Sequence, residues 1–132
     1  MDIFTHAIVG AVTGAQYNEP VLGATIAIIP DLPLIGKRKQ EPTELYKYCH
    51  SFLGLLTISL LLYAIVDNFE LCLACLVSHI VLDLPTHSDK WNPRLFYPNS
   101  YHFQNFEEWE FFNNSWFLGL GVSIIWTIVV II

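Results

Sequence analysis

The chain has 132 residues, enough for one small domain. Hydrophobic residues make up 54% of it and charged residues 14%, whereas ordinary globular domains contain about 25% charged residues. The formal net charge of −6 excludes a basic nucleic-acid binder, and the apolar content excludes a disordered chain. Because so few polar residues cannot cover a soluble domain, we expect a small protein in or on a membrane. Its odd number of cysteines argues against a disulfide-stapled secreted fold.

Five apolar segments follow one another along the chain, separated by polar breaks. The N-terminus has no basic stretch and is not a typical signal peptide. The first four segments are residues 3–16, 21–30, 51–66 and 71–84. Each of these four is shorter than the about 20 residues that cross a bilayer as a helix. The fifth, residues 111–132, has no charged residue and is long enough; its polar start places the span at 116–132.

The apolar segments are predicted to be helices. Residues 25–29 and 124–132 are rich in β-branched side chains, so strands are an alternative there. A lipid setting favours helices, because a helix satisfies its own backbone hydrogen bonds. We therefore predict an all-α fold, a compact membrane-embedded bundle of about five short hydrophobic helices, with an irregular aromatic and proline-rich segment before the last. The single domain (1–132) would comprise a metal-site core (1–98), an interfacial segment (86–110) and a C-terminal transmembrane helix (111–132).

The basic residues predict an orientation in the membrane. Four of the six lie between the second and third segments, and the other two, Lys90 and Arg94, follow the fourth. If segments one and two form one hairpin and segments three and four another, both basic regions fall on one side. The positive-inside rule makes that side cytoplasmic. Aromatic residues concentrate between Trp91 and Phe117, which indicates a belt at the membrane interface or a small aromatic core under a loop.

The informative polar residues are histidines and aspartates at the edges of the apolar segments. They are His6, Asp31, His50, His79, Asp83 and His87. In the double hairpin, His6 lies near the start of the first segment and Asp31 follows the end of the second. The third starts at His50, and the fourth ends near Asp83. All six side chains would then meet at one depth on one side, and ionisable residues at membrane depth are costly enough to favour a functional site.

The combination of residue types points to a metal ion. His79 and Asp83 are four residues apart, so on a helix they lie on one face and can reach one cation. Pro85 should end that helix near Asp83, and the following turn can bring His87 back. Mixed imidazole and carboxylate ligands suit Zn²⁺, Mn²⁺ or Fe²⁺ better than Ca²⁺, and we predict zinc, as one ion or more. The alternative is that the histidines are interfacial and the aspartates cap turns.

The cysteines are weaker candidates for a site. Cys72 and Cys75 form a C-x-x-C pair inside an apolar run, which favours core thiols over a metal site. Cys49 adjoins His50 and is a spare ligand.

Several motifs resemble those of one membrane protein family. They are Asp2-x-x-Thr5-His6-Ala7, Pro30-Asp31, His50-Ser51-Phe52-Leu53-Gly54, Ser78-His79-Ile80-Val81-Leu82-Asp83 and the segment from Trp91 to Pro98. On these motifs, residues 1–98 resemble the inner-membrane-associated metal-dependent hydrolases, also described as LexA-binding membrane proteins. The resemblance implies membrane residence, metal-dependent hydrolysis and a contact with LexA. The chain departs from the family pattern at Pro33, which replaces an acid, and at Leu45 and Tyr46, which replace a His-Arg pair.

A looser similarity concerns only the order of the candidate ligands along the chain. Zinc-dependent phospholipase C, and the zinc nucleases that share its ligand order, present His, Asp, His, His-x-x-x-Asp and His, as this sequence does. The similarity implies phosphodiester hydrolysis with more than one zinc ion.

We therefore predict a membrane-bound, metal-dependent hydrolase that acts on an ester or a phosphodiester, such as a lipid headgroup, through a metal-activated water. Asp31 or Asp83 would take the proton of that water. The alternative is a non-enzymatic membrane protein with a structural His/Asp metal site. An ion-handling module is disfavoured, because segments three and four lack polar residues along a whole helix face. The expected partners are membrane lipids and a small-molecule or lipid substrate, with no nucleic acid.

Overall fold

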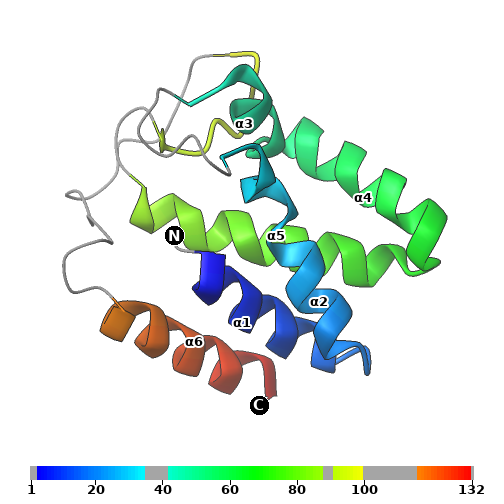
Figure 1. Ribbon diagram of the computed structural model, residues 1–132, viewed down its shortest axis with the longest axis vertical. Coiled ribbons are helices and arrows are strands. Elements are labelled where there is room, and N and C mark those ends of the chain that lie inside the picture. The colour runs from blue at the N-terminus through cyan, green and yellow to red at the C-terminus, as the bar shows by residue number, and fades with distance from the viewer. Residues whose placement is uncertain (1–2, 35–41, 88–90, 100–115, 132) are drawn as a thin grey trace.

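The structure is a computed structural model, and it describes residues 3–34, 42–87, 91–99 and 116–131. Every regular element in this part of the chain is helical (Figure 1). The elements are α1 (Ile3–Ala15), α2 (Pro20–Ala27), the 3-10 helix η1 (Ile29–Leu34), α3 (Glu44–Cys49), α4 (Phe52–Val66), α5 (Phe69–Thr86) and α6 (Trp116–Ile131). The predicted all-α fold is confirmed.

Helix α5 forms the centre of the fold. In Figure 1 it crosses the middle of the molecule, with α4 along one side and α1 and then α6 along the other. Helix α2 packs on both α1 and α5. The core includes the buried residues Ile26, Ala27, Leu55, Leu71, Cys72, Cys75 and Leu76. Cys72 and Cys75 are therefore core residues, as the sequence predicts.

Two tight turns form the predicted hairpins. Between α1 and α2, Asn18 takes a left-handed backbone conformation with φ of 62°, and Pro20 begins α2. Between α4 and α5, Asp67 takes the same conformation with φ of 54°, and the Asn68 side chain accepts a hydrogen bond from the N–H of Leu71. Asparagine and aspartate adopt this conformation more readily than other non-glycine residues, and an Asn cap satisfies a free helix N–H. Each turn therefore reverses the chain where a polar break interrupts the apolar pattern.

Glycines allow α1 and α2 to approach closely. A Cβ atom at Gly23 would overlap the carbonyl oxygen of Gly10, and one at Gly14 would overlap the carbonyl oxygen of Glu19. Small residues at such contacts let the backbones of two membrane helices come together. The contact also fixes the position of His6 on α1 relative to the residues that follow α2.

Gly23→Ala is expected to destabilise the protein by about 1–3 kcal/mol, the usual cost of overpacking, because the new methyl group meets backbone atoms. Thermal unfolding in detergent, followed by helix circular dichroism, measures the change. Gly121→Ala on α6 is the matched control, since a Cβ atom there meets nothing within 4 Å. Equal stability of the two variants would contradict this account of the contact.

The outer faces of two helices are apolar. Leu56, Leu60 and Ile65 on α4, and Ile125 and Val129 on α6, are exposed. Among the described residues, α5 is the helix long and apolar enough to cross a membrane, while α1, α4 and α6 contribute shorter apolar stretches. Exposure of so much apolar surface to water is unfavourable, so these faces fit a lipid environment.

Helix α5 does not end where the sequence predicts. It extends to Thr86, past Pro85, whereas the proline predicts an end near Asp83. That prediction is wrong because a proline in the last turn removes only one backbone donor. The Thr86 hydroxyl donates to the carbonyl of Leu82, and the N–H of His87 donates to the carbonyl of Asp83. Helix α5 has 18 residues, and the described part of α6, Trp116–Ile131, has 16. The transmembrane span at 116–132 stays a prediction.

Helix α3 lies in a stretch whose polar residues predict a connection between the second and third apolar segments. Thr43 caps it by accepting a hydrogen bond from the N–H of Tyr46. Glu44 in the first turn and Lys47 in the last complement the helix dipole. These capping signals depend only on neighbouring residues and could have predicted the helix. His50 follows directly at its C-terminal end.

Residues 91–99 pack on α3 and on the start of α4. Trp91 contacts Tyr46 edge to face, and Phe96 contacts Phe52 in the same way. Leu95 is buried in the core. The exposed pair Phe52 and Phe96 fits an interfacial belt, and the contact between Trp91 and the buried Tyr46 fits a small aromatic core, so both alternatives stay predictions. Residues 100–115 lie outside the described residues.

Candidate metal centre

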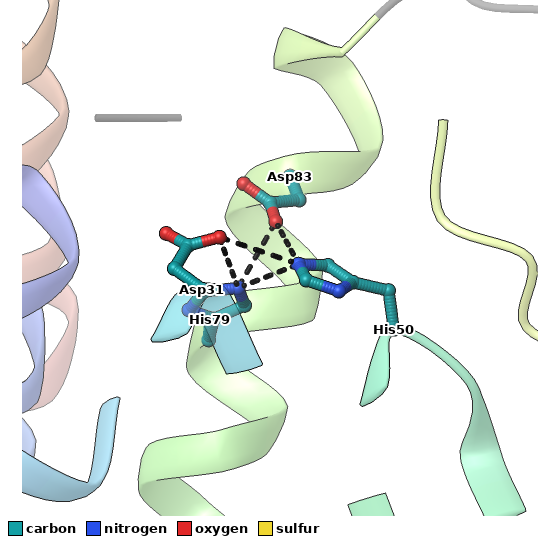
Figure 2. Close-up of side chains that lie close together, drawn as sticks. All are labelled: Asp31, His50, His79 and Asp83. Atoms are coloured by element: carbon teal, nitrogen blue, oxygen red, sulfur yellow. Dashed lines mark hydrogen bonds and ion pairs between the residues drawn. The ribbon is translucent and has the colours of Figure 1, made fainter. Parts of the chain in front are cut away.

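Four ionisable side chains from three parts of the chain meet beside α5 (Figure 2). Asp31 comes from η1, His50 from the junction of α3 and α4, and His79 and Asp83 from α5. Each offers one ligand atom, and these atoms all lie within 4.8 Å of one another. Two imidazoles and two carboxylates in this arrangement are suited to hold a metal ion.

The ligand atoms face a single point. The Nε2 atoms of His50 and His79 are 3.1 Å apart. Oδ2 of Asp83 lies 3.3 Å from Nε2 of His50 and 3.1 Å from Nε2 of His79. Oδ1 of Asp31 lies 3.6 Å and 3.9 Å from the same two nitrogens. Figure 2 shows the four side chains converging in this way from different sides.

Local helix capping places His50 in the site. Its N–H donates to the carbonyl of Tyr46 at 3.0 Å, which ends α3. Ser51 then begins α4 by accepting a hydrogen bond from the N–H of Gly54 at 3.0 Å. A Cβ atom at Gly54 would overlap the carbonyl oxygen of Tyr48, so the tight junction requires glycine there. Two caps in succession thus hold His50 against α5.

A backbone carbonyl fixes the ring of each clustered histidine. Nδ1 of His50 lies 2.9 Å from the carbonyl oxygen of Tyr46, and Nδ1 of His79 lies 2.6 Å from that of Ala27. Because a carbonyl oxygen only accepts, each Nδ1 must carry the hydrogen. In a neutral imidazole, Nε2 then holds a lone pair. Both rings therefore present lone pairs where they meet.

Two lone pairs and two carboxylates at these distances repel one another unless a cation lies between them. Neither neutral ring has a proton left for the 3.1 Å contact between His50 and His79. The cation must be an added proton or a metal ion. Histidine ligands of metals usually donate their other N–H to a carbonyl or carboxylate, as these two rings do. The residues present therefore fit a divalent metal ion.

The electrostatics of the site favour positive charge. Burial lowers the pKa of His50, but Asp31 and Asp83 outweigh this effect and raise the pKa to about 9. Burial raises the pKa of Asp31, yet the contacts with His50 and His79 hold that pKa below its ordinary value. A charged Asp31 therefore persists beside a site that attracts cations.

The centre is almost closed to solvent. His50, His79 and Asp83 are at most 1% exposed, and Asp31 is 8% exposed. Beside them, the side chain of His87 is 21% exposed. Among the described residues of the site, Asp31 and His87 therefore mark the side from which a small molecule can approach.

The remaining two predicted histidines contact the other oxygen of Asp83. Nε2 of His6, at the start of α1, lies 3.0 Å from Oδ1 of Asp83, and Nε2 of His87 lies 3.2 Å from the same oxygen. The His6 ring also stacks on the ring of His79, with centroids 3.7 Å apart. The structure thus brings together all six residues that the sequence singles out, while their roles as ligands stay predictions.

Tyr46 and Ala27 are site residues that no pattern in the sequence reveals. Both act through backbone carbonyls, which leave no signal in residue type. Tyr46 also packs its ring on His50, with centroids 3.9 Å apart, and its hydroxyl donates to the carbonyl of Trp91 at 3.1 Å. Burial raises the pKa of Tyr46 well above its ordinary value, so the hydroxyl stays a neutral donor. Cys49, the spare candidate, is buried and is not among the four clustered ligands.

Comparison with known proteins gives the family. The model of the YdjM inner membrane protein family matches residues 1–132, and the chain therefore belongs to that family. The match confirms the family resemblance of the sequence and its membrane assignment. No curated protein and no solved structure matches the chain. The similarity of ligand order to phospholipase C stays a prediction.

Proposed function

We propose that this protein is a metal-dependent hydrolase of the membrane surface, with Asp31, His50, His79 and Asp83 as metal ligands. The observation that carries the proposal is the pair of Nε2 atoms, 3.1 Å apart, which face two carboxylates while backbone carbonyls hold both Nδ1 atoms. A metal bound here would supply a Lewis acid and lower the pKa of a water to about 7. Zinc suits this mixed ligand set, and manganese and iron share the preference.

The chain's own residues orient the site and move the proton. The carbonyls of Tyr46 and Ala27 hold the two imidazoles in place, so no ring has to turn. Asp31 is the carboxylate best placed to accept a proton, because its Oδ1 faces the imidazoles and it is more exposed than Asp83. Oδ2 of Asp31 would take the proton of the attacking water.

The proposed hydrolysis consumes one water molecule for each bond that is cleaved. The water oxygen bonds to the carbonyl carbon or phosphorus, and the bond from that atom to the leaving alkoxide oxygen breaks. The proton held on Oδ2 of Asp31 passes to the leaving oxygen. The exposed apolar faces of α4 and α6 support an ester or phosphodiester of a lipid headgroup as the substrate, since they keep the site beside lipid.

Burial of the centre favours a second candidate function, a structural metal site in a non-enzymatic membrane protein. Three of the four ligands are at most 1% exposed. A site closed by four protein ligands, with no position for water, is typical of structural metals. The two functions differ in whether the bound metal turns over a substrate.

Metal analysis and hydrolysis assays on one preparation test the proposal. Protein purified in detergent is expected to contain zinc, manganese or iron and to hydrolyse at least one of a panel of nitrophenyl esters, phosphodiesters and phospholipids. His79→Ala is expected to lose both metal and activity, because it removes one ligand and leaves His50 without a partner. Val77→Ala, on an exposed position of the same helix, is the matched control. If purified wild-type protein contains no metal, both candidate functions are wrong. If it contains metal but hydrolyses none of the substrates, the structural metal site is favoured.

We also propose that the centre faces the cytoplasm. Lys47 and Arg94 belong to the segments beside the site, and the remaining basic residues lie next to these segments in the sequence. The three native cysteines are buried, so single exposed cysteines can report the topology. A membrane-impermeant maleimide added to intact cells is expected to label Glu70→Cys, at the far end of α5, and to spare Glu44→Cys. The opposite pattern would reverse the orientation.

A further inference from the structure

Asp83 lies between two pairs of imidazoles. Its Oδ2 faces Nε2 of His50 and His79, whereas its Oδ1 faces Nε2 of His6 at 3.0 Å and of His87 at 3.2 Å. Two ligand atoms that are each about 2.1 Å from one ion are about 3.0–3.4 Å apart. Both oxygens of Asp83 therefore have the spacing of co-ligands with their own pair of histidines.

We propose that His6, His87 and Oδ1 of Asp83 form a second cation subsite, joined to the first by the Asp83 carboxylate. This inference rests on the proposed metal centre, because the two subsites share Asp83. Oδ2 of Asp31 borders the second subsite at 3.9 Å from Nε2 of His6. The carboxylate of Asp83 would then face a cation on each side.

The two subsites differ in openness. The first has four protein ligands and almost no exposure, which is the pattern of a closed metal site. Among the described residues, the second has three candidate protein ligands, one of them the 21% exposed His87, and three protein ligands are typical of metal sites that also bind water or substrate. The accessible cation would meet the substrate, and the buried cation, joined to it through the carboxylate of Asp83, would keep the Lewis-acid role proposed above.

A pair of cations bridged by Asp83 favours one class of substrate among the esters proposed above. Two metal ions held about 3.5–4 Å apart stabilise both the attacking and the leaving oxygen of an in-line displacement at phosphorus. The second subsite therefore favours a phosphate ester over a carboxylic ester as the substrate of the proposed hydrolase.

The competing arrangement has no second cation. In it, the Nε2–H of His6 donates to Oδ1 of Asp83 and makes His6 a positioning residue. His6 differs from His50 and His79 here, because its buried Nδ1 has no hydrogen-bond partner among the described residues. No carbonyl of the described residues thus fixes the tautomer of His6, and metal stoichiometry has to decide between the two arrangements.

The test uses full-length protein in detergent, first stripped of metal and then loaded with Mn²⁺. After gel filtration, wild-type protein is expected to hold about two ions per chain and to give the spin-coupled electron paramagnetic resonance spectrum of a bridged pair. His87→Ala is expected to hold about one ion with the spectrum of isolated Mn²⁺. Val77→Ala is the matched control on the preceding helix and should behave as wild type.

The outcomes separate the two proposals. About one ion per wild-type chain, unchanged in His87→Ala, would overturn the second subsite and leave the first metal centre standing. No bound ion in wild-type protein would overturn both. The wild-type stoichiometry decides the question even if His87→Ala fails to fold.

Discussion

Asp83→Asn is expected to lower the metal affinity of the protein by more than about 100-fold, beyond the loss that follows removal of an outer-shell partner. The side chain is fully buried, and its two oxygens contact four imidazoles. Asparagine keeps the shape of the side chain but removes its charge and one acceptor oxygen. Its amide hydrogens can donate to one pair of Nε2 lone pairs, so the protein is expected to fold while losing the metal.

Glu44→Gln provides the matched control, because it makes the same chemical change at an exposed carboxylate that pairs with Lys47 outside the cluster. Equilibrium dialysis against Zn²⁺ measures both variants, and circular dichroism reports whether they fold. The control should retain wild-type affinity. If Asp83→Asn folded and still bound zinc as tightly as the control, Asp83 would not be a metal ligand.

The sequence predicts the hairpins because their turns are marked by residue type. Asn18 and Asp67 adopt the left-handed backbone that reverses the chain, and Pro20 and Asn68 begin the following helices. Once both hairpins are assumed, the polar residues at the ends of the apolar segments have to meet on one side. The position of the candidate site therefore follows from topology alone, without any knowledge of side-chain contacts.

The geometry inside the site could not be predicted in the same way. The ring orientations of His50 and His79 depend on the carbonyls of Tyr46 and Ala27, and every residue type has a carbonyl. Each oxygen of Asp83 faces a different pair of imidazoles. This arrangement depends on helix positions that are accurate to less than a hydrogen-bond length of about 3 Å, and the spacing of residues along the chain does not specify positions that closely. The prediction for the end of α5 is wrong for a related reason. Whether Pro85 ends the helix depends on the hydrogen bonds that Thr86 and His87 make around it.

Removal of the metal is expected to lower the stability of the whole protein, because the ligands join segments that are otherwise linked by loops. Asp31 follows α2, His50 separates α3 from α4, and Asp83 lies on α5. A ligand that binds only the folded state stabilises it by about 4 kcal/mol when its free concentration is about 1,000 times the dissociation constant. Chelation should therefore shift the unfolding transition in detergent to lower temperature, and added Zn²⁺ should restore it.

His79→Ala distinguishes this linkage from a general effect of the chelator on detergent or lipid. The variant lacks one ligand nitrogen, so its unfolding temperature should be lower than that of wild type and should respond neither to chelator nor to Zn²⁺. Val77→Ala should respond as wild type does, since its side chain is exposed on the same helix. An unfolding temperature of wild-type protein that is the same with and without metal would show that no ion crosslinks η1, the α3–α4 junction and α5.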